Sequence, residues 1–271
     1  MQDPTSKLEV LIAAMNIRSK EQVPIVATQA LDWGCSALMI NQTRSQPIFE
    51  SPSESLRIFN YSELGISKSR NRALSHARGE ILLITDEDVE LLDGFSKTLT
   101  EAFDKNPEAD LITFQCLNEK GAKRKNYADS GFWHDKRSIM RVSSVEIAMR
   151  RDSLEKNALF FDERFGVGSK FPTGSETVFL SDALARGMKI LYHPKAIVMH
   201  PDESSGRALF GNRELIRAKG GMFCRIFGWK AYGICLYFAL KKRKETGFSL
   251  LQNMKLMLSG IEQFKALDHD Q

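Results

Sequence analysis

The stretch ISKSRNRALSHARGEILLITDEDVEL, residues 66–91, decides the fold class of this chain. It predicts a helix over 66–78, an apolar strand over 80–85, and then three consecutive acids, Asp86-Glu87-Asp88. The nearly continuous apolar run ILLIT is typical of a strand that is buried on both faces of a parallel sheet. Ligands of open α/β sheets bind at the carboxyl ends of the strands. The sequence therefore places an acidic ligand site at the edge of an α/β sheet.

Asp86 and Asp88 are separated by one residue, so an extended chain points both side chains to the same side. A divalent cation prefers such hard oxygen ligands and often keeps substrate phosphates among its other partners. Taken alone, an acidic triplet is more often a solvated turn. Its position directly after a buried strand favours a site for a metal ion and a phosphate group.

The rest of the chain continues the alternation of strands and helices. Strands are expected at 8–15, 36–42, 56–60, 110–117 and 145–151, and helices at 22–33, 94–105 and 176–186. Polar loops are expected at 43–55 and 118–143. This alternation predicts an α/β fold with a mainly parallel sheet.

Two blocks of sequence resemble glycosyltransferase family 2. The first contains the residues of a "G-x-S-x-x-RN … A-x-G … DxD" stretch: Gly65, Ser67, Arg70, Asn71, Ala77, Gly79 and the acidic triplet. The second, FDERFGVGSKFPTGSETVFLSDALARGMKILYHP over 161–194, resembles the family's "FDE-x-FG … GED-x-x-F … G-x-x-I-x-x-x-P" segment. The resemblance covers roughly residues 8–205. It implies the GT-A fold, a nucleotide-sugar donor and inversion of the anomeric centre.

The predicted architecture is a single Rossmann-like, GT-A-type α/β domain with a mainly parallel mixed sheet and a C-terminal helical extension. The catalytic domain is expected at 1–206. Its nucleotide-sugar half is expected at about 1–117 and its acceptor half at about 118–206. Residues 207–271 form the basic and aromatic helical extension.

The resemblance implies that the ends of the first two strands lie beside the nucleotide base. Ala13, Met15 and Asn16 close the first strand, and Asn41 closes the second. Many relatives have an aspartate near Asn41 that reads uracil. An asparagine can donate and accept hydrogen bonds, so it can also read a base. We expect a UDP-sugar, with dTDP- and GDP-sugars as open alternatives.

Lys68 and Arg70 lie near the start of the helix over 66–78, where free N–H groups attract phosphate. An arginine can add a bidentate contact to the same group. The equal alternative is that Arg70 pairs with a local acid such as Glu63 and only braces the fold.

The resemblance implies a divalent cation, Mn²⁺ or Mg²⁺, that bridges the two donor phosphates. Asp88 is then a metal ligand, and Asp86 faces the ribose or a metal-bound water. Glu87 lies between them in the donor site. His200 ends the strand AIVMH, where the family often has a metal-binding histidine, and is the third candidate ligand.

Inverting transfer needs a general base that removes the proton of the acceptor hydroxyl. By resemblance, Glu176 is that base, because it takes the position of the second acid in "GED", while Ser175 replaces the first. The alternative is a helix-start acid that complements the helix dipole. Gly166, Gly168 and Gly174 predict a mobile approach to Glu176.

The chain has 271 residues and a net charge of +4, with ten Lys or Arg residues but one acid over 207–244. Aromatic residues along a helix expected over 222–240 indicate either packing on the catalytic domain or peripheral contact with a membrane surface. Nucleic-acid binding is disfavoured, because no known motif accompanies the basic cluster. Four cysteines without CxxC spacing and the lack of a signal-peptide pattern predict a cytoplasmic location, with or without attachment to the cytoplasmic face of the membrane.

These features predict a hexosyltransferase that acts on a glycan or lipid-linked saccharide during surface polysaccharide synthesis. A catalytically degenerate scaffold is one alternative, and Ser175 and Asn41 are the residues that keep it open. A sugar-phosphate nucleotidyltransferase is another. It normally has a glycine-rich basic loop after the first strand, where this chain has AAMNIRSKEQ, residues 13–22.

Overall fold

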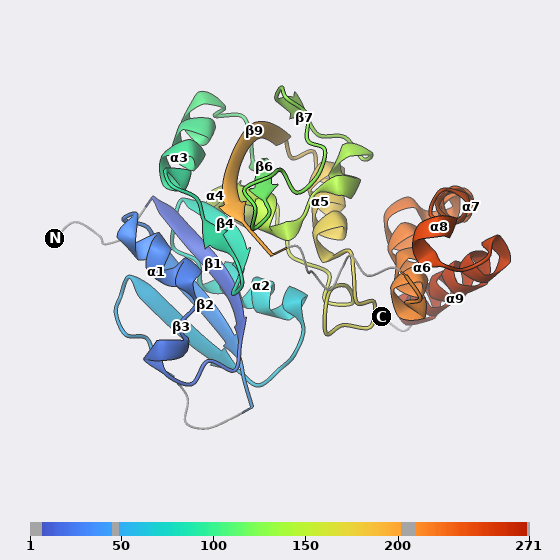
Figure 1. Cartoon of the computed structure of the whole chain (residues 1–271), viewed down its shortest axis with the longest axis horizontal. Coiled ribbons are helices and arrows are strands. Elements are labelled where there is room, and N and C mark those ends of the chain that lie inside the picture. The colour runs from blue at the N-terminus through green and yellow to red at the C-terminus, as the bar shows by residue number, and fades with distance from the viewer. Residues whose placement is uncertain (1–6, 45–48, 202–209, 270–271) are drawn as a thin grey trace. The chain divides into compact units, whose positions relative to one another are not determined.

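The computed structural model describes residues 7–44, 49–201 and 210–269 (Figure 1). The chain divides into two compact units. Unit 1 comprises Met1–Leu64, Lys68–Phe161 and Phe179–Asp202, and unit 2 comprises Gly65–Ser67, Asp162–Val178 and Glu203–Gln271. The expected boundary at 206/207 lies outside the described residues, so that division of the chain stays a prediction.

Unit 1 contains one sheet of nine strands in the order β3-β2-β1-β4-β8-β6-β9-β5, with β7 paired to β9 (Figure 1). The strands are β1 (Leu8–Met15), β2 (Ser36–Gln42), β3 (Leu56–Tyr61), β4 (Ile81–Asp86), β5 (Glu90–Leu91), β6 (Leu111–Leu117), β7 (Phe132–Trp133), β8 (Ile147–Arg150) and β9 (Ile190–Met199). β1, β2, β3 and β4 are mutually parallel neighbours, as are β6 and β9. β8 lies antiparallel between β4 and β6. The expected GT-A-type α/β fold with a mixed sheet is confirmed.

Five helices connect or follow these strands. They are α1 (Ile25–Asp32), α2 (Ile66–His76), α3 (Phe95–Lys105), α4 (Arg151–Lys156) and α5 (Ser175–Ala185). Short 3₁₀ turns lie at Lys20–Gln22, Ser138–Arg141 and Ser144–Glu146. The expected strand over 145–151 is shorter than predicted, because a 3₁₀ turn occupies its start and α4 begins at Arg151.

Unit 1 has a hydrophobic core on each face of its sheet. Successive side chains of a strand point to opposite faces, so Val10 and Ile12 of β1 pack on one side and Leu11 on the other. The first core includes residues of α1 and α3, and the second includes residues of α2, α4 and α5. The layers are therefore helix, sheet, helix, and the carboxyl ends of β1, β2 and β4 meet at one edge.

The C-terminal part of unit 2 is helical. Its helices are α6 (Arg213–Phe227), α7 (Ala231–Lys241), α8 (Arg243–Thr246) and α9 (Leu250–His269), with a 3₁₀ turn at Gly228–Lys230 between α6 and α7. The prediction of one helix over 222–240 is wrong, because Gly228 adopts a φ of 56° and ends α6. Two helices with different buried faces therefore stand in place of the single expected helix.

Helices α6 and α9 approach each other at backbone distance. A Cβ atom on Gly220 would clash with the carbonyl of Met257, and one on Gly260 would clash with the carbonyl of Arg217. Glycine is therefore required at both positions for this helix crossing. Across residues 7–44, 49–201 and 210–269, no helix combines the length and apolar composition that crossing a bilayer requires.

Candidate active site

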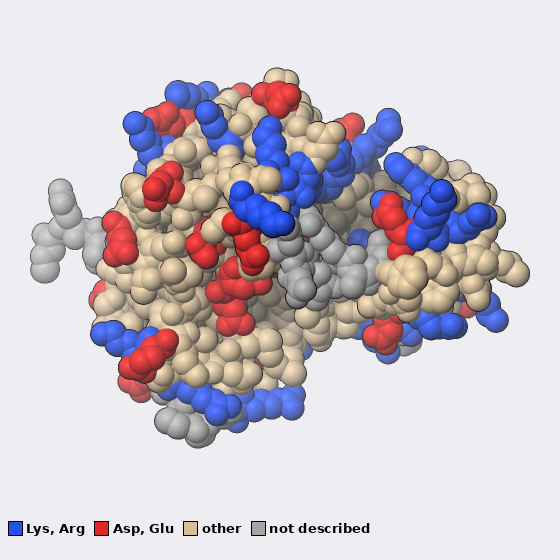
Figure 2. Space-filling model, viewed as in Figure 1, with Lys and Arg blue, Asp and Glu red and all other residues tan. Residues whose placement is uncertain are grey.

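The acidic triplet follows β4 at the edge of unit 1 where β1 also ends. Ala13 of β1 is in register with Asp86 of β4. The backbone N–H of Met15 donates a hydrogen bond of 3.2 Å to a carboxylate oxygen of Glu87. Figure 2 shows acidic side chains gathered in the region where Figure 1 places the ends of these strands. The predicted position of the triplet at the ligand-binding edge is thus the observed one.

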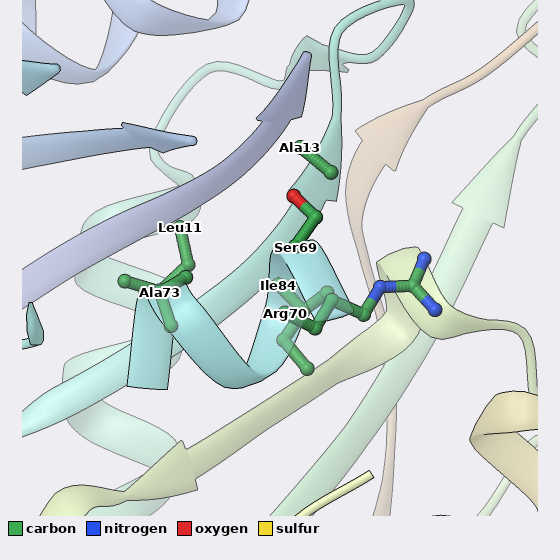
Figure 3. Close-up of a pocket in the computed structure, with 6 residues that line it drawn as sticks. All are labelled: Leu11, Ala13, Ser69, Arg70, Ala73 and Ile84. Atoms are coloured by element: carbon green, nitrogen blue, oxygen red, sulfur yellow. The ribbon is translucent and has the colours of Figure 1, made fainter. Parts of the chain in front are cut away.

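Arg70 of α2 is buried and its guanidinium donates to Asp86 at 3.0 Å. Figure 3 shows this guanidinium pointing away from Leu11 and the other apolar side chains of α2 and β1. The expected alternative partner, Glu63, pairs instead with Arg72 at 2.8 Å. We name the segment Asp86-Glu87-Asp88 the acidic turn. Arg70 pairs with the first acid of this turn and not with an acid near α2, so it links α2 to the acidic turn.

His200 points its Nε2 towards Asp88, with 3.6 Å between Nε2 and a carboxylate oxygen. Its Nδ1 lies 2.9 Å from the carbonyl oxygen of Pro201. A carbonyl only accepts hydrogen bonds, so Nδ1 carries the proton, and a neutral ring then has its lone pair on Nε2, facing Asp88. The Arg124 guanidinium donates to the same Pro201 carbonyl at 2.7 Å.

The residues at this edge fit a divalent cation only in part. Two atoms bound to one cation at about 2.1 Å each lie about 3.0–3.6 Å apart, depending on the angle between them. The 3.6 Å between His200 and Asp88 is therefore suited to two ligands of one ion. Asp86, the remaining candidate ligand, is paired with Arg70. Within the described residues no group of three His, Cys, Asp or Glu side chains forms a metal site.

Glu87 has an electrostatically distinct position in the triplet. Partial desolvation raises the pKa of Glu87, and the carboxylates of Asp88 and Asp86 raise it further, although the N–H of Met15 lowers it. Like charges so close together favour the arrival of a cation or the uptake of a proton.

The backbone has an uncommon conformation where the nucleotide base of the donor is expected to bind. Asn16 directly after β1 has a φ of 57°, the left-handed region that non-glycine residues seldom adopt. Asn41 is completely buried. Its side-chain oxygen accepts from the N–H of Ile17 at 2.9 Å, and its amide donates to the Ile17 carbonyl and to Asn60 at 2.8 and 2.7 Å. Asn41 thus fixes the turn after β1 and presents no unused N–H group to a base.

A small void lies between α2 and the strands β1 and β4. Figure 3 shows its lining side chains, which are Leu11, Ala13, Ser69, Arg70, Ala73 and Ile84. Its volume of about 10 Å³ has room for a single water molecule. It is a packing gap beside the carboxyl ends of β1 and β4 and is too small to hold a nucleotide.

Glu176 is the second residue of α5, in unit 2, and its side chain is half-buried. The Ser175 hydroxyl donates to its carboxylate at 3.1 Å. Lys219 of α6 is the charged neighbour. Burial lowers the pKa of Lys219, and the interaction with Glu176 partly offsets this. The start of α5 thus carries a carboxylate with a partly desolvated lysine nearby.

The loop that leads to Glu176 is packed against helices of its own unit. A Cβ on Gly174 would clash with Met222 of α6, and one on Gly166 would clash with Ile66. The ring of Phe171 stacks on Phe165 with 5.0 Å between centroids. Gly166 and Gly174 thus permit close packing at positive φ, and the mobile approach to Glu176 stays a prediction.

Asp162, at the start of this loop, joins the loop to α6. It accepts from Arg164 at 2.7 Å and from Arg225 at 3.0 Å. Burial raises the pKa of Asp162, but these hydrogen bonds outweigh it and hold the pKa below its usual range. The base candidate thus depends on a C-terminal helix for the support of its loop.

Sequence reasoning missed two residues at these centres, Arg124 and Lys219. Arg124 lies in a polar segment that gave no motif, and only the fold brings it to the carbonyl after His200. Lys219 was counted with the basic residues of the extension. Its spacing from buried Leu215 and Met222 was the one available signal that it faces inward.

The family model described as "Glycosyl transferase family 2" matches residues 50–172. This match confirms, over that part of the chain, the resemblance predicted from the sequence. The comparison with curated proteins gives no match.

Solved structures of S. aureus TarS are similar to this chain in fold. One TarS structure is 16% identical with a TM-score of 0.56, and covers 90% of this chain and 44% of its own. This chain thus spans less than half of that TarS chain. TarS 1-349 in complex with UDP-GlcNAc is 12% identical with a TM-score of 0.58, and covers 96% of this chain and 92% of its own. TarS 1-349 in complex with UDP is 15% identical with a TM-score of 0.57, and the match covers 90% of this chain and 73% of that TarS chain.

Proposed function

We propose that this chain is an inverting, metal-dependent glycosyltransferase that moves a sugar from a nucleotide diphosphate donor to a hydroxyl of a glycan. The observation that carries the proposal is the acidic turn after β4, inside the segment that matches the family, with Asp88 facing His200. UDP is the favoured nucleotide, and TarS structures with UDP and UDP-GlcNAc support this choice. The proposed acceptor is a glycan or lipid-linked saccharide of surface polysaccharide synthesis.

The proposed donor half is residues 1–117. In it, Ala13, Met15 and Asn16 line the place of the base and ribose. Asn41 acts through the turn after β1, because its amide holds the backbone of Ile17 on both sides. A base can then be read by the backbone groups of that turn. The proposed acceptor half is residues 118–206.

The donor phosphates are proposed to lie between the start of α2 and the acidic turn. Lys68 is half-buried in the first turn of α2 and supplies positive charge there. Arg70 fixes the position of Asp86 through its hydrogen bond. Asp86 and Glu87 are proposed to contact the ribose or a bound water. A phosphate at a helix start also gains from the free backbone N–H groups.

Asp88 and His200 are the residues proposed to hold the cation. A Mn²⁺ or Mg²⁺ ion held by these two residues would supply Lewis-acid stabilisation of the charge on the leaving diphosphate. The hydrogen bond of His200 to the Pro201 carbonyl orients the ring for this role, as hydrogen bonds behind metal ligands commonly do. Arg124 keeps that carbonyl in place through its own hydrogen bond.

Glu176 is proposed as the general base. Its carboxylate accepts the proton of the acceptor hydroxyl as the hydroxyl oxygen forms a bond to the anomeric carbon. The bond from that carbon to the diphosphate breaks, and the diphosphate leaves with the electron pair. No covalent bond to the chain forms, so the anomeric centre inverts. Ser175 and Lys219 position the carboxylate, by a hydrogen bond and by charge.

The test is transfer by the Glu176→Gln variant, assayed as nucleotide released in the presence of donor and acceptor. We expect a loss of at least about 10²-fold in kcat, with unchanged donor affinity by calorimetry. The matched control is Glu262→Gln, an exposed acid of α9 in the same unit. Full transfer by Glu176→Gln contradicts the assigned base. Donor binding without transfer by the wild-type chain favours the degenerate-scaffold alternative.

Peripheral membrane contact through residues 207–244 is part of this proposal. A lipid-linked acceptor lies in a bilayer, so an enzyme that binds the bilayer surface meets its acceptor at a high local concentration.

A further inference from the structure

Helix α7 of unit 2 exposes a continuous apolar face. The spacings are three or four from Trp229, in the 3₁₀ turn before α7, to Tyr232, Leu236 and Leu240. Tyr237 directly follows Leu236, so the five residues lie on one side of the helix. We name them the α7 face: Trp229, Tyr232, Leu236, Tyr237 and Leu240, with 78%, 44%, 45%, 62% and 58% of their surfaces exposed. A contiguous exposed apolar patch of large side chains marks an interaction surface, whereas single exposed apolar residues do not.

The opposite side of α7 fixes the orientation of this face. Ala231, Cys235 and Ala239 are completely buried and recur every four residues. Phe238 meets the edge of Phe223 of α6 with 5.7 Å between ring centroids. The helix therefore packs within unit 2 through small residues and Phe238, and directs the residues of the α7 face outward.

Each aromatic residue of the α7 face has a lysine against it. Lys230 lies 5.9 Å from the centre of the Trp229 ring. Lys265 of α9 lies 3.2 Å from the Tyr232 hydroxyl, and Lys241 lies 3.3 Å from the Tyr237 hydroxyl. The ammonium groups thus stand beside the apolar side chains, where they can reach charged groups above the face.

The charge around the face has one sign. Residues 229–244 contain five Lys or Arg residues and no acid. Lys241, Arg243 and Lys244 at the end of the segment are exposed. Lys242 is the member of this cluster that pairs with Glu245, at 2.7 Å. A partner for this surface must have an apolar region that receives the side chains of the α7 face and negatively charged groups that meet the surrounding Lys and Arg residues.

We infer that the α7 face docks on the surface of a bilayer that contains anionic lipids. This inference deepens the membrane part of the proposed function by naming the residues and the lipid chemistry. Aromatic and leucine side chains enter the boundary between headgroups and acyl chains, with the helix lying in the plane of the surface. The lysines meet lipid phosphates, and the amphipathic Trp and Tyr rings suit the same depth. A nucleic acid matches the charge but offers no apolar layer for Leu236 and Leu240.

Two quantitative consequences follow from this binding mode. Each exposed lysine contributes about a fivefold factor to binding on an anionic surface at low salt. This factor shrinks as ionic strength shortens the Debye length. Each large side chain of the α7 face contributes about tenfold or more through the apolar area that it buries. Binding should therefore depend on both lipid charge and the α7 face.

The experiment is co-sedimentation of the full chain with vesicles, in the absence of donor and acceptor. One set of vesicles is phosphatidylcholine, and the other mixes phosphatidylcholine with phosphatidylglycerol. We expect binding to the mixed vesicles alone, weakened by salt. Trp229→Ala and Leu240→Ser should each lower it about tenfold, and Lys241→Gln about fivefold. All three residues are exposed, so circular dichroism and the melting temperature should stay at wild-type values.

Matched controls exist in unit 1. Trp133 is also exposed and also has a lysine, Lys189, 6.0 Å from its ring centre, but it lies on β7. Trp133→Ala and Lys97→Gln, an exposed lysine of α3, should leave vesicle binding unchanged.

Three outcomes overturn the inference. They are no binding to mixed vesicles, equal binding to both kinds of vesicle, or binding that the α7 variants leave intact. A concentration-dependent dimer that Trp229→Ala abolishes, without vesicle binding, assigns the face to a second copy of the chain. Donor binding is measured separately, so failure of vesicle binding leaves the proposed transferase site standing. Failure of donor binding likewise leaves the docking inference standing.

Discussion

The ion pair between Arg70 and Asp86 predicts a measurable coupling between helix α2 and the acidic turn. Arg70 is 5% and Asp86 27% exposed at the side chain, and the two groups are 3.0 Å apart. Two unit charges at this distance interact by about 5 kcal/mol at an effective dielectric constant of 20, and by about 1.4 kcal/mol in water. Desolvation of both groups offsets part of this gain. We expect a net coupling of about 1–3 kcal/mol.

The perturbation is a double-mutant cycle of Arg70→Met and Asp86→Asn. Arg70→Met leaves Asp86 beside the two other acids without its partner, so it should lower the free energy of unfolding by about 2–4 kcal/mol. The added loss from Asp86→Asn should be small once Arg70 is gone. Urea unfolding of the four proteins, followed by circular dichroism, gives the coupling.

The control cycle uses Arg72→Met and Glu63→Gln. This pair is 2.8 Å apart, and its arginine is far more exposed than Arg70, with 48% of the side chain accessible against 5%, whereas the two acids are alike at 28% and 27%. Solvent screening limits its coupling to about 0–0.5 kcal/mol. A coupling between Arg70 and Asp86 no larger than the control refutes the view that Arg70 anchors the acidic turn.

Three further predictions concern single residues. Burial lowers the pKa of His134 from 6.5 to about 4, so the unfolded chain binds the proton more readily. The free energy of unfolding is therefore highest above about pH 6.5 and falls by about 3 kcal/mol in all as the pH falls from there through about 4. His134→Gln should flatten this part of the curve of unfolding free energy against pH. Gly220→Ala should destabilise the chain by about 1–3 kcal/mol or more, whereas the control Gly233→Ala in α7, which meets open space, should stabilise it by about 0.5–1 kcal/mol in thermal unfolding. Arg124→Met should weaken Mn²⁺ affinity about tenfold, because it releases the Pro201 carbonyl that orients His200. Electron paramagnetic resonance measures this affinity, and an unchanged value would show that Arg124 does not support the metal site.

The sheet and the site edge could be predicted because they depend on local patterns. An apolar run such as ILLIT must be buried, and acids directly after it must lie at the end of that strand. The strands over 8–15 and 36–42 were predicted at the bounds they have in the structure. The two-residue strands β5 and β7 could not be predicted, because so few residues give no periodicity.

The partners of the site residues could not be predicted, because they come from distant segments. Asn41 bonds to Ile17 and Asn60, which depends on how three strands align. The loop before Glu176 packs on Met222 of α6, and glycine alone does not reveal whether it serves motion or close approach. Only the assembled fold distinguishes these two uses of glycine.

The helical extension shows the same limit in another form. Its aromatic and basic residues were visible in the sequence, but the break at Gly228 was not recognised as a helix end. Once α6 and α7 are separated, the inward side of α7 and its exposed face become distinct. A residue such as Lys219 then belongs with Glu176 rather than with the surface cluster.

The most direct test of the central claim is calorimetric binding of a UDP-sugar to the wild-type chain and to Asp88→Ala, each with Mn²⁺ and with EDTA. We expect binding to the wild-type chain with Mn²⁺ and loss of that binding both with EDTA and in Asp88→Ala. Binding that survives both changes would contradict a cation-dependent donor site at the turn after β4. The absence of binding to UDP-, dTDP- and GDP-sugars alike would contradict a donor site in this chain altogether.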